Sequence, residues 1–141
     1  MIFKLLRVAG RVAHVPEALY HYNRTNVNAI TKKSSQAHFD DIKANADDVM
    51  SFLAEHPVPD PEYLEFFKLD VKLPFLMDRS REQYARWKSW YPEANAWIMR
   101  NRHQPLRLRF VQKLAAMGLF PLVCLYSLAV DKLYYGILYR K

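Results

Sequence analysis

Hydrophobic side chains recur at helical spacing over most of the chain beyond residue 35. Between Gln36 and Glu55 they are separated by three or four positions, which places them on one face of a helix. This stripe consists of Phe39, Ile42, Ala46, Val49, Met50 and Leu53. Ser34 or Ser35 supplies a hydroxyl that can cap the first free backbone N–H groups of such a helix. The pattern therefore predicts a helix over residues 36–55.

Prolines delimit the next predicted helix. Residues 56–61 read HPVPDP and break the chain sharply. Asp60 is expected to cap the helix that follows, with Pro61 at its first position, and Pro74 is expected to kink or end it. The helix is apolar on more than one side, which predicts a central place in the core. Its apolar residues are Tyr63, Phe66, Phe67, Leu69, Val71 and Leu73.

Three further segments follow. Ser80 is expected to cap a helix that runs to about Trp90, with Gln83 at the reciprocal capping-box position. Pro92 opens a short segment, and Pro105 opens another that ends at Gly118. The last segment covers residues 119–141.

The first 35 residues have a different pattern. Residues 1–9 are typical of the last turns of a helix, which Gly10 is expected to close in a left-handed turn. The runs 11–15 and 19–23 alternate by twos and predict a β-hairpin. The predicted fold is therefore mainly α, with a short N-terminal β-hairpin followed by a helical subdomain of about four to six helices. We place the two domains at residues 1–35 and 36–141.

Composition narrows the class of protein. The chain has 141 residues, of which 51% are hydrophobic, and this argues against disorder across its whole length. Only three residues are glycine, which favours helices. The net charge of +7 favours an anionic partner, such as nucleic acid, a phosphate-bearing substrate or a membrane surface. Cys124 is the one cysteine, so it has no partner within the chain for a disulfide, and its apolar surroundings predict a buried side chain.

The C-terminal third is basic and apolar. No acidic residue lies between Glu93 and Asp131. The cations in the first half of this interval are Arg100, Arg102, Arg107, Arg109 and Lys113. The uncharged run from 119 to 130 is shorter than the about 20 residues that a spanning helix needs. We therefore consider two alternatives for residues 105–141: an interfacial segment on an anionic membrane, or a helix packed on the protein with solvated cations.

Catalytic motifs are missing from the chain. Three isolated glycines cannot form a phosphate-binding loop, and none of the five histidines has a partner at metal-ligand spacing. The carboxylate pairs Asp40–Asp41 and Asp47–Asp48 are expected on the solvated face of the 36–55 helix. No nucleic-acid reader motif accompanies the basic residues. We therefore predict no catalytic residue, no metal site and no nucleic-acid partner for this chain.

The most informative stretch is Val12 to Thr31, which reads VAHVPEALYHYNRTNVNAIT. Its segment VPEALYHYNR, from Val15 to Arg24, resembles the end of the catalytic domain of family 2 glycosyltransferases, which have the GT-A fold. In that family a strand with a Pro-Glu pair and Tyr-x-Tyr leads into a loop rich in Asn. The resemblance covers about the first 30 residues, and similar bacterial enzymes assemble surface polysaccharide and lipooligosaccharide.

The resemblance implies that a complete enzyme would move a sugar from a nucleotide-sugar donor to a glycan or lipid-linked acceptor, with Mn or Mg as divalent metal. The family's nucleotide-binding half, its Asp-x-Asp motif and its catalytic base lie upstream of this segment. This chain would then be the C-terminal portion of such an enzyme, not catalytic on its own, and cytoplasmic at the inner face of the cytoplasmic membrane. By position, the loop near the donor diphosphate would contain Tyr22, Arg24, Asn28 and Thr31. Ala29 stands where relatives often have Ser.

A second interpretation stays open. Chemistry alone allows the polar loop to be an ordinary connection, since Asn and Thr are common in turns. The chain would then be a non-enzymatic helical module that binds a membrane surface or a protein partner.

Overall fold

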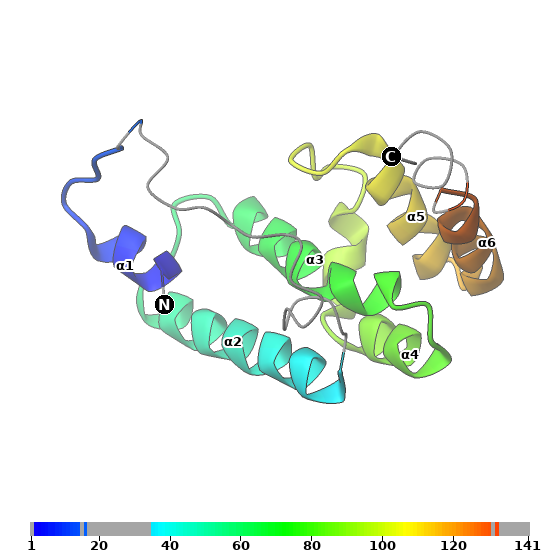
Figure 1. Cartoon of the computed structure of the whole chain (residues 1–141). Helices are drawn as coiled ribbons and strands as arrows, with labels where there is room; N and C mark the ends of the chain where they lie inside the picture. The colour runs from blue at the N-terminus through cyan, green and yellow to red at the C-terminus, as the bar shows by residue number, and fades with distance from the viewer. Residues whose placement is uncertain (1, 15, 17–34, 131, 133–141) are drawn as a thin grey trace. The chain divides into compact units, whose positions relative to one another are not determined.

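The computed structural model describes residues 2–14, 16, 35–130 and 132 (Figure 1). These residues are mainly helical, which confirms the predicted mainly α class. The helices are α1 (Ile2–Val8), α2 (Gln36–Glu55), α3 (Glu62–Met77), α4 (Arg81–Ser89), the 3-10 helix η2 (Pro92–Trp97), α5 (Leu106–Ala116) and α6 (Phe120–Val130).

The predicted β-hairpin falls mostly outside the described residues. Residues 11–14 and 16 are described, and they have no regular secondary structure. The second predicted strand, residues 19–23, is not described, so the hairpin stays a prediction.

The chain forms two compact units, Met1–Pro57 and Val58–Lys141. In the first unit α1 packs against α2. The Lys4 Nζ lies 2.6 Å from a carboxylate oxygen of Asp48 and 5.7 Å from the ring centre of Phe52. The predicted domain boundary between residues 35 and 36 rests on the family resemblance and stays a prediction.

Helix α2 begins and ends where the sequence predicts. The Ser35 hydroxyl accepts a hydrogen bond from the backbone N–H of His38 at 3.2 Å, which confirms Ser35 as the N-cap. The apolar stripe is buried at Phe39, Ala46, Val49 and Leu53. Asp40, Asp41 and Asp48 are exposed on the other side, as expected for a solvated face.

The prediction for Gly10 is wrong. Helix α1 ends at Val8, and Gly118 is the one described glycine with a positive φ. The backbone N–H of Ala9 donates to the Leu5 carbonyl at 3.0 Å, and the chain bends at Gly10 without a positive φ. Because the helix does not end in a left-handed turn, nothing here requires the conformational freedom of glycine.

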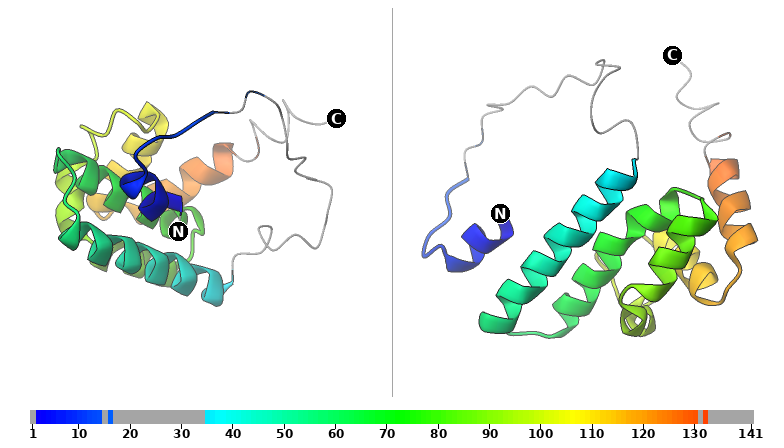
Figure 2. Two further views of the ribbon diagram at one scale, coloured as in Figure 1. Left: turned by 90° about the vertical axis from the view of Figure 1, so that its left-hand side faces the viewer. Right: turned by 90° about the horizontal axis from the view of Figure 1, so that it is seen from below.

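In the second unit α3 is the central helix. It packs against α4, η2 and α5, and α5 packs against α6 (Figures 1 and 2). Phe66, Leu69, Phe75 and Leu76 of α3 are buried, which confirms the predicted central position. Tyr63 was expected in the apolar part of this helix, but 54% of its surface is exposed.

The ends of α3 differ in how well they were predicted. The Asp60 carboxylate accepts a hydrogen bond from the Glu62 N–H at 2.9 Å, but α3 begins at Glu62 with Pro61 as its N-cap, one position later than predicted. Pro74 does not end the helix, because α3 continues through it to Met77. Proline removes one backbone donor, but the Asp78 N–H still bonds to the Pro74 carbonyl at 3.2 Å, so the last turn stays closed.

The later helix ends follow the sequence signals. The Ser80 hydroxyl accepts from the Gln83 N–H at 3.1 Å, and η2 begins at Pro92. Helix α5 follows Pro105, and Gly118 closes it with φ of +82°. The Leu119 N–H bonds back to the Leu114 carbonyl at 3.0 Å. A side chain at position 118 would be strained in this left-handed turn, so glycine is required there.

Candidate functional site

The residues proposed for a donor-diphosphate loop are Tyr22, Arg24, Asn28 and Thr31. All four lie outside the described residues. Their role stays a prediction from the family resemblance.

Two of the five predicted surface cations are held by the protein itself. The Arg100 guanidinium lies 4.7 Å from the ring centre of Trp97 and 3.9 Å from a carboxylate oxygen of Glu62. The Arg109 guanidinium donates a hydrogen bond to the Met99 carbonyl at 2.9 Å. Arg100 still exposes 65% of its side chain, whereas Arg109 is half-buried.

The other three cations face water. Arg102, Arg107 and Lys113 are exposed. Among the described residues, none of the three forms an ion pair or a hydrogen bond. Their charges are therefore available to an external anion.

The exposed face of α5 carries large apolar side chains beside these cations. Leu106, Phe110 and Met117 expose 67%, 55% and 63% of their surfaces. Together with Lys113 they occupy positions i, i+4, i+7 and i+11, which lie along one side of a helix. We call these four residues the α5 stripe. The opposite side of α5 is buried, with Val111 at 1% and Ala115 at 0%.

Helix α6 adds further exposed apolar surface. It is apolar around its whole circumference, and only Val123 is buried among its residues. Leu122, Leu125 and Leu128 expose 47%, 64% and 49% of their surfaces. Large exposed apolar patches are rare on monomeric proteins and usually mark an interaction site.

The sequence predicts the cations of this surface and the apolar character of the C-terminal third, but not which apolar residues of α5 are exposed. The apolar residues between Pro105 and Gly118 include Leu106, Leu108, Phe110, Leu114 and Met117. Their spacing places them on two faces of the helix. Leu108, Val111 and Ala115 lie on the side opposite the α5 stripe. The signal was therefore present in the sequence, as apolar residues on both faces of one short helix.

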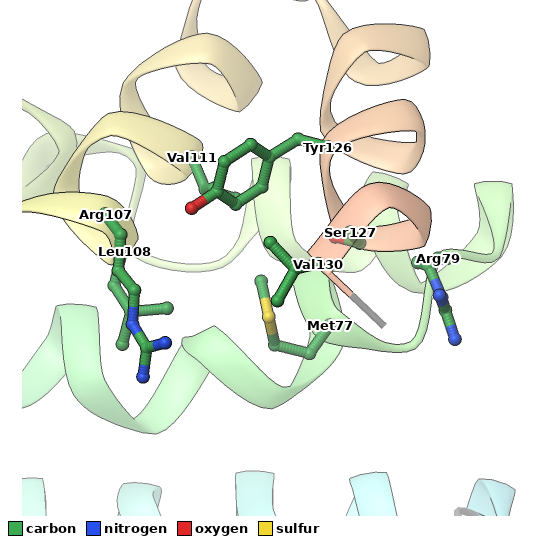
Figure 3. Close-up of a pocket in the computed structure, with 8 residues that line it drawn as sticks. All are labelled: Met77, Arg79, Arg107, Leu108, Val111, Tyr126, Ser127 and Val130. Carbon is green, nitrogen blue, oxygen red and sulfur yellow. The ribbon is translucent and has the colours of Figure 1, made fainter. Parts of the chain in front are cut away.

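The ends of α3 and α6, together with α5, enclose a pocket of about 260 Å³ (Figure 3). Its lining residues are Met77, Arg79, Arg107, Leu108, Val111, Tyr126, Ser127 and Val130. Apart from Arg107, no residue of this pocket was singled out as functional from the sequence, because its walls come from segments far apart in the chain.

Cys124 lies on α6 near this region. The sequence predicted a buried side chain, but Cys124 is only half-buried. Its Sγ is 3.9 Å from the Arg79 carbonyl oxygen. The expectation of full burial is therefore wrong: Val123 is the one residue of α6 that is buried, and the next residue, Cys124, is partly exposed.

Two lysines of α3 are buried, which the sequence did not predict. Lys72 has no exposed surface, and its Nζ donates to the Trp90 carbonyl at 3.1 Å, the Tyr91 carbonyl at 3.2 Å and Asn95 Oδ1 at 2.8 Å. Its ammonium also lies 4.3 Å from the ring centre of Trp87. All three donors are used and no surface reaches the amine, so Lys72 holds α3 to the turn before η2 and is closed to a substrate.

Lys68 forms a second, more peripheral ion cluster. Its Nζ lies 2.7 Å from Glu65 and 3.0 Å from Glu93. Burial alone would lower the pKa of Lys68, but the hydrogen bonds and charges of Glu65 and Glu93 outweigh it and raise the pKa above its ordinary value. The ammonium therefore stays charged and links α3 to η2.

A polar network ties α3 to α5. The Asp70 carboxylate accepts hydrogen bonds from the side-chain amides of Asn101, at 3.4 Å, and Gln104. The Gln112 amide donates in turn to the Gln104 side-chain oxygen. Asn101, Gln104 and Gln112 are all buried, so the network fixes the segment before α5.

Within the described ranges, no three His, Cys, Asp or Glu side chains come together in a way that could hold a metal ion. None of the helices described is both long and apolar enough to cross a membrane.

No family model matches the chain, and no curated protein or solved structure matches it either.

Proposed function

We propose that α5 and α6 bind an anionic membrane surface, and that the helical part of the chain serves as a non-catalytic module of a sugar-transferring enzyme. The observation that carries the first part is the α5 stripe, in which Leu106, Phe110 and Met117 are exposed beside Lys113. Helices with an apolar face and flanking cations lie in the plane of the membrane interface.

Two energy terms support binding to anionic lipid. Burying a large apolar side chain contributes about 1.5–3 kcal/mol. The apolar residues of the α5 stripe therefore supply the greater part of the expected free energy of membrane binding. Each Lys or Arg near an anionic leaflet contributes about 1 kcal/mol. Arg102, Arg107 and Lys113 therefore favour anionic over neutral lipid, and no acidic side chain between Glu93 and Asp131 opposes them.

Co-sedimentation with vesicles tests this proposal. We expect the protein to bind phosphatidylcholine vesicles that contain phosphatidylglycerol, to bind pure phosphatidylcholine much less, and to bind more weakly as salt rises. The triple substitution Arg102→Gln, Arg107→Gln and Lys113→Gln should weaken binding to anionic vesicles on the order of a hundredfold.

A matched control separates a local surface from net charge. The triple substitution Lys43→Gln, Arg81→Gln and Lys88→Gln removes the same charge from exposed positions elsewhere, and it should leave most binding intact. Equal losses in the two triple variants would mean non-specific attraction and would contradict the proposal. No binding of wild type to anionic vesicles would overturn it and favour a protein partner for the same surface.

The link to glycosyltransferases is the second part of the proposal. It is supported by the segment from Val15 to Arg24 and its resemblance to the end of a family 2 catalytic domain. The complete enzyme would use a nucleotide-sugar donor, a divalent Mn or Mg ion and a polysaccharide or lipooligosaccharide acceptor. Its donor and catalytic groups would lie upstream, and Tyr22, Arg24, Asn28 and Thr31 would form the loop near the donor diphosphate.

Calorimetric titration with UDP- and GDP-sugars plus manganese tests this link in a protein extended upstream. We expect donor binding by the extended protein only. Arg24→Ala should weaken it about tenfold, since hydrogen bonds from arginine to phosphate are charge-assisted. Arg102→Ala is the control, because it removes an arginine outside the loop. Unchanged donor affinity in Arg24→Ala would reject the loop assignment, and no binding by the extended protein would reject the glycosyltransferase link.

A further inference from the structure

The pocket between α3, α5 and α6 combines an apolar interior with cationic edges. Four apolar side chains line it, namely Met77, Leu108, Val111 and Val130. Figure 3 shows Met77 and Val130 facing each other at its centre, with Arg107 on one side of this pair and Arg79 on the other. The interior is therefore suited to an aliphatic group and the edges to an anion.

Polar groups among the described lining residues are few. Tyr126 and Ser127 contribute hydroxyls, and Arg79 and Arg107 contribute guanidiniums. In Figure 3 the Tyr126 ring lies beside Val111, with its hydroxyl directed to the side of Arg107. None of the described lining residues is a carboxylate, and the hydroxyls and guanidiniums among them favour an anionic head group.

The size of the pocket limits its occupant. At about 260 Å³ it is smaller than the about 300–1,000 Å³ of pockets that enclose drug-sized ligands. It has room for one aliphatic segment but not for the two chains of an ordinary phospholipid. Ligand pockets of this kind are mostly apolar, with a few polar groups that orient the ligand.

The backbone at one edge is held in an unusual conformation. Arg79 has φ of +68°, a region that side chains other than glycine adopt at a cost of roughly 1–2 kcal/mol. Residues held in such conformations are common at ligand-binding sites. The turn directs the chain from α3 into α4 and places Arg79 at the edge of the pocket.

We propose that this pocket binds the alkyl chain of a single-chain amphiphile, with the anionic head group at Arg107. The inference goes beyond attachment to a membrane surface, because the ligand enters the protein as a single molecule. Arg107 is the one residue that it shares with that attachment. The pocket uses the side of α5 that carries Leu108 and Val111, whereas the surface uses the α5 stripe.

Calorimetry with octyl phosphate as a monomer in solution tests the pocket without any bilayer. We expect saturable binding at one site, and much weaker binding of octanol and of inorganic phosphate. Arg107→Gln should weaken binding of octyl phosphate about tenfold. Lys113→Gln removes one charge from the same helix outside the pocket, and it should leave this affinity unchanged.

A second variant tests the apolar interior. Ser127→Phe adds a ring at a half-buried position in the lining and should abolish binding of octyl phosphate. Ala129→Phe adds the same ring to the exposed side of α6 and should not. Near-ultraviolet circular dichroism of both variants checks that they remain folded. If Ser127→Phe does not fold, Arg107→Gln still tests the pocket independently.

The outcomes separate the pocket from the surface and identify the source of the ligand. Unchanged affinity in both Arg107→Gln and Ser127→Phe, equal binding of inorganic phosphate, or no binding of octyl phosphate would each overturn the pocket proposal. None of these results bears on vesicle binding. If Ser127→Phe also weakens binding to anionic vesicles, the ligand comes from the bilayer. If it abolishes octyl phosphate binding alone, the ligand is a free amphiphile.

Discussion

Lys72 carries a buried charge on a helix that would otherwise be a simple apolar centre. Taking an ammonium out of water is costly unless its donors are satisfied. Here the Trp90 and Tyr91 carbonyls and the Asn95 side chain accept all three N–H bonds. Lys72 shares the Tyr91 carbonyl with the Ala94 N–H, which donates to the same oxygen at 3.2 Å. The residue therefore determines how the turn before η2 is held against α3.

The burial of Lys72 makes stability depend on pH. Desolvation lowers the pKa of Lys72 from 10.5 to about 8, so the folded protein releases this proton near pH 8 and the unfolded chain near pH 10.5. Stability rises with pH wherever the unfolded state binds more protons. The contribution of Lys72 should therefore become more favourable as pH rises through this window, by up to about 3 kcal/mol.

Urea unfolding of wild type and Lys72→Met at several pH values from 7 to 10.5 measures this effect. The difference in the free energy of unfolding should shift in favour of wild type from about pH 8 upward. The hydrogen bonds that Lys72→Met loses add the same amount to this difference at every pH, so they do not affect how it changes with pH. The pKa of nearby Lys68 is raised, so its contribution is lost only above this window. A difference that stays flat with pH would show that Lys72 is not desolvated.

At the scale of single elements, α5 has two apolar faces with different roles. Val111 is 1% exposed and belongs to the core, whereas its neighbour Phe110 is 55% exposed on the α5 stripe. The core face contributes to stability. The outer face adds little to folding, which is expected if it is kept for binding.

Alanine substitution at these neighbouring positions separates the two faces. Val111→Ala should lower the free energy of unfolding by about 2 kcal/mol and leave a folded protein with vesicle binding intact. Phe110→Ala should cost under about 1 kcal/mol of stability and weaken vesicle binding. Urea unfolding and vesicle co-sedimentation of both variants give the comparison. If Phe110→Ala destabilises the protein more than Val111→Ala does, the stripe is part of the core.

Helix ends were predictable because their signals are local. Ser35, Asp60 and Ser80 each accept a backbone hydrogen bond from a residue two or three positions ahead, and neighbouring sequence alone determines this geometry. Gly118 was predictable for the same reason. The prediction of a left-handed turn at Gly10 was wrong because glycine permits such a turn but does not require one.

Features that depend on tertiary contacts were not predictable. Lys68 and Lys72 have charged side chains, which usually lie in water, and their burial depends on acceptors 18 to 25 residues away. The pocket joins α3 to α5 and α6, so no single window of sequence shows it. The five surface cations were predictable in position, but only the fold distinguishes Arg109, which is tied to Met99, from Arg107, which is exposed.

At the scale of the whole molecule, the two compact units differ in how much hydrophobic core each has for folding on its own. Unit Val58–Lys141 has a core of its own, which includes Leu69, Ala94 and Ile98. Unit Met1–Pro57 has two described helices, of which α2 is the longer. Isolated helices shorter than about 12–15 residues are marginal in water, and most of the stability of a helix in a protein comes from packing of its apolar face. We therefore expect the second unit to fold without the first.

The three tryptophans make this expectation measurable. Trp87, Trp90 and Trp97 are the only tryptophans in the chain, and all lie in the second unit. Fluorescence of the whole chain therefore reports unfolding of that unit alone. We expect residues 58–141, produced separately, to unfold cooperatively in urea with the same midpoint as the tryptophan signal of the whole chain. Far-ultraviolet circular dichroism of the whole chain should then show an additional loss of helix at lower urea, from α1 and α2. A lower midpoint for residues 58–141 than for the whole chain would mean that the first unit stabilises the second, and the membrane and pocket experiments would then require the whole chain.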